Sequence, residues 1–204
     1  LSGPLPPELC ELVRLNYLNL QNNRFSGPLP AEIGKMTGLT LLDLTSNRFS
    51  GPLPEEIGRL IHLRSLLLSE NEFSGELPET LGNLINLRNF YVKTNRLSGP
   101  FPVVLTKLVK LEYLNLSFNN FSGTIPAEIG NWEELKHLYL WKNQFSGSIP
   151  PSIGKLRNLT ELSLGENRLS GELPKELGQL ENLVTAYLNN NAFTGQIPNE
   201  MTRA

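Results

Sequence analysis

The stretch FSGPLPAEIGKMTGLTLLDLTSNRFSGPLPEEIG, from Phe25 to Gly58, contains the phrase Phe-Ser-Gly-Pro-Leu-Pro twice, and the two copies begin 24 residues apart. The glycine of this phrase recurs at the same interval, without insertion or deletion, from Gly3 to Gly195. A proline stands three residues after each of these glycines, and an asparagine recurs in phase from Asn23 to Asn191. A fixed period of this size predicts stacked structural units, each in contact with its neighbours only.

The apolar residues of each unit predict one short strand. Leu18 and Leu20 are two residues apart, so both side chains lie on one face of an extended segment. Because this pair recurs once per unit, its strands must run parallel and form one long sheet. The corresponding pairs are Leu42/Leu44, Leu66/Leu68, Phe90/Val92, Leu114/Leu116, Leu138/Leu140, Leu162/Leu164 and Ala186/Leu188. A single unit cannot bury these side chains, but a neighbour on each side can.

The repeated polar and turn residues are predicted to be scaffold. A carboxamide can both donate and accept hydrogen bonds. The asparagine column is therefore expected to tie successive units together where the chain turns away from the strand. The glycine column is expected to supply a backbone conformation that a side chain forbids. The proline column, which fixes φ and donates no hydrogen bond, suits a turn or an edge.

Two segments carry a resemblance to a known family. LTLLDLTSNRFSGPLPEEIGRLIHL (Leu39–Leu63) and LEYLNLSFNNFSGTIPAEIGNWEEL (Leu111–Leu135) resemble the plant-type leucine-rich repeat, which is found in receptor-like kinase ectodomains and polygalacturonase-inhibiting proteins. The resemblance implies an α/β-type solenoid, a right-handed leucine-rich repeat superhelix of about eight 24-residue repeats. It further implies a concave parallel β-sheet, a second, lateral strand at Ser-Gly-x-Ile/Leu-Pro, and short 3-10 turns on the convex side.

The chain is expected to be a single leucine-rich repeat solenoid over residues 1–204. Family members usually carry cysteine-paired caps, whereas this sequence has one cysteine, Cys10, and opens within a repeat. It is therefore interpreted as a fragment of a longer protein that lacks its caps. Cys10 and Thr106 occupy a column otherwise filled by glycine, and Cys10 is expected to be a substituted turn residue, whose thiol, if exposed, could form dimers.

Function is expected where the repeats differ, on the outward positions that flank the buried pairs. Aligned positions of neighbouring parallel strands lie side by side. Exposed tyrosine and tryptophan on a rigid surface are typical of interaction hot spots, although aromatic residues also suit strands as such. The predicted ligand-binding residues are Tyr91, Lys93, Tyr113, Phe118, His137, Tyr139 and Trp141.

Three Asn-x-Ser/Thr sequences, at Asn115, Asn120 and Asn158, predict N-glycosylation in a secretory pathway. Asn115 conflicts with the aromatic site, because its column places it between Tyr91 and Tyr139. Either Asn115 is unoccupied, or the binding surface is smaller than the predicted set.

The composition argues against several other classes of function. Eighteen basic residues are offset by 20 acidic ones, which disfavours nucleic-acid or anionic membrane surfaces. No apolar run approaches the roughly 18 residues of a spanning helix. The two histidines, His62 and His137, lie more than three repeats apart, so no catalytic cluster, metal site or cofactor is predicted. His62 is expected to be solvated.

The predicted function is recognition of a protein, peptide or glycan ligand on the concave face of an extracellular or cell-surface module, as in a receptor ectodomain. A secreted inhibitor of a cell-wall-degrading enzyme is one alternative. A structural or adhesive surface segment, which needs no soluble ligand, is the other.

Overall fold

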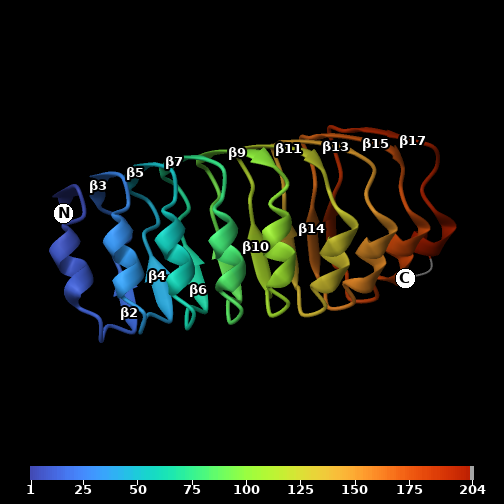
Figure 1. The fold of residues 1–204 in the computed structure, drawn as a ribbon. Helices are drawn as coiled ribbons and strands as arrows, with labels where there is room; N and C mark the ends of the chain where they lie inside the picture. Colours follow the sequence, from blue (N-terminus) through green and yellow to red (C-terminus); the bar gives the residue numbers. More distant parts are fainter. Residues whose placement is uncertain (203–204) are drawn as a thin grey trace.

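The computed structural model describes residues 1–202 as a solenoid of stacked coils. Each complete coil contributes two short strands and one short 3-10 helix, and Figure 1 shows the coils side by side along the molecule with the helices in a row. Residues 203 and 204, the last two of the predicted solenoid, lie outside the described residues. The predicted repeat solenoid is confirmed.

One sheet contains the eight predicted strands, all parallel and each hydrogen-bonded to the strands of the adjoining coils. Its register advances by one repeat per strand, so that Leu18 faces Leu42 and Leu42 faces Leu66. The strands are β2 (Tyr17–Asn19), β4 (Leu41–Asp43), β6 (Ser65–Leu67), β8 (Asn89–Tyr91), β10 (Tyr113–Asn115), β12 (His137–Tyr139), β14 (Glu161–Ser163) and β16 (Thr185–Tyr187).

The Ser-Gly segments form a second parallel sheet of nine strands. Each glycine of the column has φ between 73° and 95°, a left-handed region that side chains disfavour, so the predicted backbone role of this column is confirmed. The strands are β1 (Ser2–Gly3), β3 (Arg24–Gly27), β5 (Arg48–Gly51), β7 (Glu72–Gly75), β9 (Arg96–Pro100), β11 (Asn120–Thr124), β13 (Gln144–Gly147), β15 (Arg168–Glu172) and β17 (Ala192–Thr194).

The proline column lies between this second strand and the 3-10 helix and occupies the N-cap position of the helix. The carbonyl of Pro30, for example, accepts the first bond of its helix from the N–H of Ile33 at 3.0 Å. The helices are η1 (Pro7–Glu11), η2 (Ala31–Lys35), η3 (Glu55–Arg59), η4 (Glu79–Asn83), η5 (Val103–Lys107), η6 (Ala127–Asn131), η7 (Pro151–Lys155), η8 (Lys175–Gln179) and η9 (Asn199–Thr202). No helix among residues 1–202 is long and apolar enough to cross a bilayer.

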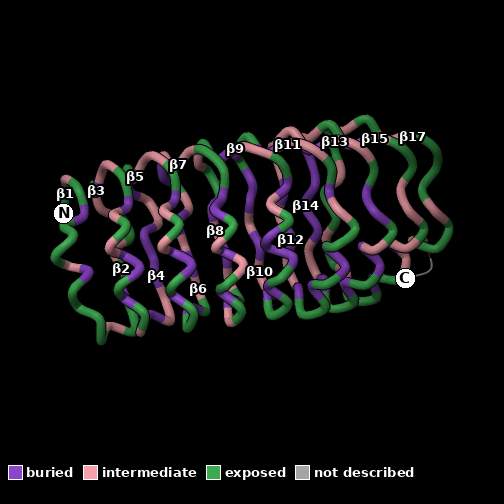
Figure 2. Tube along the Cα trace, viewed as in Figure 1, coloured by how far each residue is buried: buried purple, intermediate pink, exposed green. Residues whose placement is uncertain are grey.

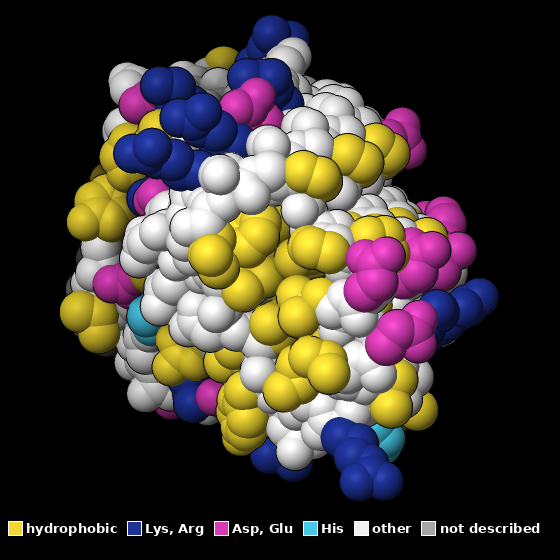
Figure 3. Space-filling view, turned by 90° about the vertical axis from the view of Figure 1, so that its left-hand side faces the viewer, with side chains coloured by type: hydrophobic (Ala, Val, Ile, Leu, Met, Phe, Trp, Pro, Cys, Tyr) yellow, Lys and Arg dark blue, Asp and Glu magenta, His cyan; other side chains and the backbone are white. Residues whose placement is uncertain are grey.

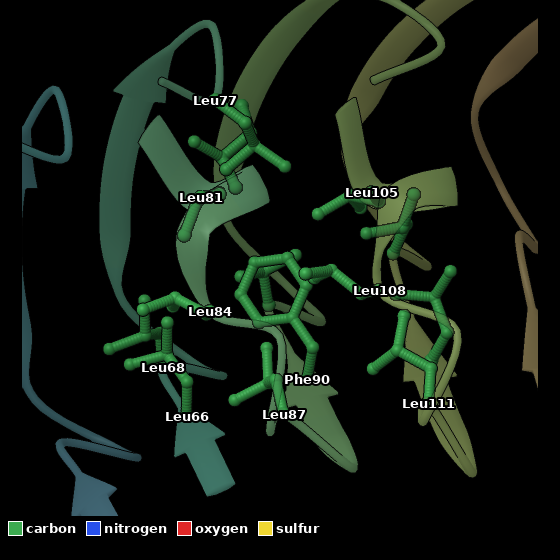
Figure 4. Close-up of a cluster of buried hydrophobic side chains, with 14 of the residues drawn as sticks. Leu66, Leu68, Leu77, Leu81, Leu84, Leu87, Phe90, Leu105, Leu108 and Leu111 are labelled. Carbon is green, nitrogen blue, oxygen red and sulfur yellow. The ribbon is translucent and has the colours of Figure 1, made fainter. Parts of the chain in front are cut away.

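One continuous apolar core fills the space between the two sheets and the 3-10 helices. Figure 2 shows buried residues recurring in every inner coil, and Figure 4 shows Phe90 surrounded by leucines from its own and neighbouring coils. Phe90 and the leucines labelled with it are almost completely buried, between 0% and 7% exposed. Coil-to-coil contact therefore buries the leucines that one coil alone leaves exposed.

The asparagine ladder connects each coil to both neighbours. Asn71 donates through Nδ2 to the carbonyl of Leu68 in its own coil at 3.2 Å and of Leu44 in the preceding coil at 2.9 Å. Its Oδ1 accepts the N–H of Phe49 at 3.0 Å. The same pattern recurs from Asn47 to Asn191, which confirms the predicted ladder, with backbone groups as the partners.

The first coil has a neighbour on one side only. Figure 3 faces the end of the solenoid that carries this coil, and hydrophobic side chains gather there. Cys10 lies in η1 with a fully buried thiol, so the condition for dimer formation, an exposed thiol, is not met. Burial also raises the pKa of Cys10, which keeps the thiol protonated.

Candidate functional site

The face of the eight-stranded sheet that points away from the core, hereafter the open face, carries the predicted ligand-binding residues. In β10 and β12 the central leucines, Leu114 and Leu138, are fully buried. The residues beside them point outward and are partly exposed. The predicted inward and outward positions are therefore correct.

Three side chains from neighbouring strands form a ring cluster. The rings of Tyr113 and His137 meet edge-on with centroids 4.7 Å apart, and His137 meets Tyr139 at 5.6 Å. The Tyr139 hydroxyl donates to the carboxylate of Glu161. Because the hydroxyl has one proton, the 2.9 Å contact between Nδ1 of His137 and Oη of Tyr139 requires the histidine to donate. The cluster is thus held in one orientation.

Burial, followed by the hydrogen bond to the Glu161 carboxylate, raises the pKa of Tyr139 well above its usual range. Burial raises the pKa of Tyr91 as well, with a smaller contribution from Tyr113. Both hydroxyls therefore stay protonated near neutral pH. They can donate hydrogen bonds and pack against a ligand, but they cannot act as bases there.

An ion-pair network borders the ring cluster where the strands begin. Glu112 binds Nζ of Lys136 at 2.7 Å and also the guanidinium of Arg88. These hydrogen bonds, that from Lys136 first, lower the pKa of Glu112. Lys136 lies 5.9 Å from the ring centre of Tyr113. Since the carboxylate already has two cationic partners, this border offers little unpaired charge to a ligand.

Beside the ring cluster the open face has a shallow depression of about 350 Å³. This volume lies at the small end of the roughly 300–1,000 Å³ typical of ligand pockets, so the depression fits one anchoring group better than a whole ligand. Its walls are mainly aromatic and its floor is made of small polar residues. The lining residues are Lys93, Asn115, Ser117, Phe118, Tyr139, Trp141, Ser163 and Tyr187.

Tyr187 is a member of the site that the predicted set omits. The rings of Trp141 and Tyr187 lie 5.6 Å apart, although their strands are separated by the coil that carries Ser163 and Gly165. Both of these small residues are buried beneath their aromatic neighbours. The sequence signal for this contact was a coil with small outward residues between two coils with aromatic ones. The small residues leave room for the indole of Trp141 to reach Tyr187 across that coil.

Phe118 has an unusual backbone for its residue type. It occupies the left-handed position that precedes the ladder asparagine, with φ of 57°, where seven other coils place Asn, Ser, Thr, Glu or Lys. A bulky residue at positive φ is a conformational outlier, and such strain is often associated with function. Its ring is 40% exposed and lies between two ammonium groups, Lys93 at 5.6 Å and Lys142 at 5.2 Å from its centre.

The predicted set therefore divides into two parts of one surface. Tyr113 and His137 belong to the ring cluster, and Lys93, Phe118 and Trp141 to the depression, while Tyr139 contributes to both. Tyr91 lies apart from the depression on β8, next to Asn115 on β10.

The three glycosylation acceptors differ in surroundings. Asn115 lies on the open face, lines the depression and accepts the N–H of Ser117 at 3.0 Å. Asn120, at the start of β11, and Asn158 are both exposed. Nδ2 of Asn158 donates to the carbonyl of Glu133 at 2.8 Å on the surface.

Residues 1–202 contain no group of three His, Cys, Asp or Glu placed to hold a metal ion. His62 is exposed in the loop that follows η3, as expected. What remains at the open face is a rigid aromatic surface with ammonium, amide and hydroxyl donors, which suits binding.

Two leucine-rich repeat family models match the chain. A leucine-rich repeat region model matches residues 6–120, and a leucine-rich repeat model matches residues 110–132, 134–156 and 158–180. A search of curated protein sequences gives no match.

Several solved plant receptors are similar to the chain. A TDR receptor shares 40% identity with a TM-score of 0.96, covering 98% of this chain and 34% of that one. The ectodomain of the Arabidopsis thaliana receptor kinase GASSHO1/SCHENGEN3 was solved with CASPARIAN STRIP INTEGRITY FACTOR 2. It shares 35% identity with a TM-score of 0.88, and the match covers 98% of this chain and 27% of that one. The Arabidopsis receptor kinase HAESA was solved with the peptide hormone IDA and the co-receptor SERK1. It shares 34% identity with a TM-score of 0.83, and the match covers 100% of this chain and 38% of that one.

The chain spans about a third of the length of these receptor structures. The family models together match most of its residues, and the receptor ectodomains share its coils. The chain therefore belongs to the leucine-rich repeat family, in its plant type.

Proposed function

We propose that this chain is part of an extracellular receptor ectodomain, and that the open face is a concave surface that binds a peptide or protein. The observation that carries the proposal is the aromatic depression, in which Phe118 keeps an unfavourable backbone conformation at an exposed position. Peptide hormones bound to related receptors support the choice of ligand class. A solenoid presents these side chains on a rigid frame, so little conformational entropy is lost on binding.

The open face can be tested with a defined probe, a phage-displayed library of random linear 12-residue peptides. Peptides selected on the wild-type chain are expected to bind the double variant Tyr139→Ala with Trp141→Ala at least about tenfold more weakly, because exposed aromatic anchors dominate such interfaces. The Tm should change little, since both side chains point away from the core. Ile85→Ala, on an exposed turn, is the control and should bind normally. Unchanged binding by the double variant would contradict the proposal.

Phe118→Asn separates binding from stability. Asparagine tolerates positive φ better than phenylalanine, so the variant is expected to gain about 0.5–1 kcal/mol in the free energy of unfolding. It should nevertheless lose about tenfold in affinity for the selected peptides, because one wall of the depression is removed. Urea unfolding and isothermal titration calorimetry measure the two effects. A variant that is more stable and binds equally well would show that Phe118 has no part in recognition.

We also propose N-glycans at Asn120 and Asn158, and an unmodified Asn115 in the ligand-binding form. Both exposed asparagines are accessible to an oligosaccharide, whereas a glycan on Asn115 would fill the depression that it lines. Expression through a eukaryotic secretory pathway, with peptide mapping by mass spectrometry, should find glycan at Asn120 and Asn158 only. Full occupancy of Asn115 in protein that still binds the selected peptides would contradict the proposed site.

A further inference from the structure

Two lysines supply positive charge at the depression. Of its eight lining residues, Lys93 alone is charged, and Lys142 approaches from the other side of Phe118. Neither ammonium forms an ion pair within residues 1–202, where both have the Phe118 ring as their partner. A ring face is a weaker partner for ammonium than a carboxylate is. Glu161 is engaged by the Tyr139 hydroxyl, and Glu166, which occupies the position of Lys142 in the next coil, forms no ion pair with it among the described residues.

Two uncharged polar groups of the depression are hydrogen-bond donors that have no acceptor among the described residues. Oδ1 of Asn115 already accepts the N–H of Ser117, while its Nδ2 has no partner among the described residues. Nε1 of Trp141 is buried and likewise unpartnered in the described chain. A tryptophan N–H usually finds a partner when buried, and an unmade hydrogen bond there is costly. A ligand oxygen can satisfy this group once the indole turns toward it.

The aromatic walls of the depression favour an apolar ligand group next to that oxygen. The rings of Trp141 and Tyr187 pack together in a tilted arrangement, with centroids 5.6 Å apart, and Tyr139 and Phe118 also line the depression. An aliphatic or proline side chain packed against these rings buries its surface without leaving a polar group unpaired.

We infer that the depression takes an acidic peptide segment, with an apolar side chain packed against the rings of Trp141 and Tyr187 and with its carboxylates paired with Lys93 and Lys142. The inference rests on the proposed function and specifies its ligand: the aromatic walls select the apolar group, and the two lysines select the charge. Charge complementarity of this kind also speeds association and makes it dependent on salt.

The test uses the 12-residue peptide library described above. Peptides are selected on the wild-type chain and depleted on Trp141→Ala, so that the remaining ones depend on the depression. One such peptide is then synthesised with its Asp and Glu residues intact and with Asn and Gln in their place. Both forms are titrated against the wild type, against Lys93→Gln with Lys142→Gln, and against a charge-matched control, Lys107→Gln with Lys175→Gln. All four lysines are exposed, so each variant should keep the wild-type Tm.

The selected peptides are expected to contain an acidic residue within two positions of an apolar one. Neutralising the peptide or the Lys93/Lys142 pair should each weaken binding about tenfold, and combining the two changes should cost little more, because they remove the same interaction. The control should bind like the wild type. Binding should also weaken as NaCl is raised from about 0.05 to 0.5 M.

Two results overturn the inference in different ways. Trp141-dependent peptides without acidic enrichment, or with affinity insensitive to Lys93 and Lys142, would refute the ligand class and leave the proposed function standing. If no Trp141-dependent peptide is selected while an acidic oligosaccharide, such as oligogalacturonate, binds through the same lysines, both proposals fail and the depression is a glycan site.

Discussion

Replacing Asn71 by alanine is expected to lower the free energy of unfolding by about 3–4 kcal/mol. The substitution leaves the N–H of Phe49 without its side-chain acceptor and removes one of the two amide donors from each of the carbonyls of Leu44 and Leu68, which keep Asn47 and Asn95. All of these groups are buried, so water cannot replace the lost amide without entering the core. Since Asn71 connects two coils, the loss weakens their interface as well as one turn.

Urea unfolding followed by circular dichroism measures this effect. Asn86→Ala is the matched control, because Asn86 is partly exposed at the surface, where its Nδ2 donates to the Ile61 carbonyl at 3.0 Å and its Oδ1 accepts from Lys110 at 2.9 Å. It should cost under about 1 kcal/mol, since water can take over a surface hydrogen bond. Equal losses for the two variants would mean that the asparagine ladder does not stabilise the solenoid.

Trp132→Ala is expected to cost a similar amount, about 3–5 kcal/mol. Trp132 is fully buried and replaces a leucine of its column, packing at 6.2 Å against the ring of Phe101. Its Nε1 donates to the carbonyl of Leu105 in the preceding coil at 3.0 Å. The variant therefore leaves a cavity between two coils and removes one of the two hydrogen bonds to the Leu105 carbonyl, which keeps the N–H of Leu108.

Trp132→Leu separates these two contributions, because leucine is the usual residue of this column and refills most of the space. It should cost about 1–2 kcal/mol, largely from the lost hydrogen bond. Urea unfolding of both variants at one protein concentration gives the comparison. If Trp132→Leu is as destabilising as Trp132→Ala, the cavity is not the main cause.

The repeat made the backbone of this protein predictable from its sequence. A 24-residue period with paired leucines left one arrangement in which every unit buries its apolar face, so the eight strands and their outward positions followed directly. The ladder asparagines and the glycines followed for the same reason, since an identical residue in each coil implies an identical backbone requirement.

The contacts between side chains of different coils were less predictable. The pairing of Trp141 with Tyr187 crosses a whole coil and depends on the rotamer of a long side chain above Ser163 and Gly165. Cys10 appeared to be a turn residue because its column is glycine, yet its thiol is buried in η1. Column membership determines where a residue sits on the coil, whereas its contacts depend on the neighbours of that one coil.

The central claim is that ligands bind on the open face, and the two tryptophans of the chain allow a direct test. Their indole N–H groups give two resonances in a nitrogen–proton correlation spectrum, assigned with Trp132→Phe and Trp141→Phe. Trp141 lines the depression, while Trp132 is fully buried and hydrogen-bonded to Leu105. Titration with a peptide selected from the library should shift the Trp141 indole resonance and leave that of Trp132 in place. A peptide that binds without moving the Trp141 signal would contradict the claim.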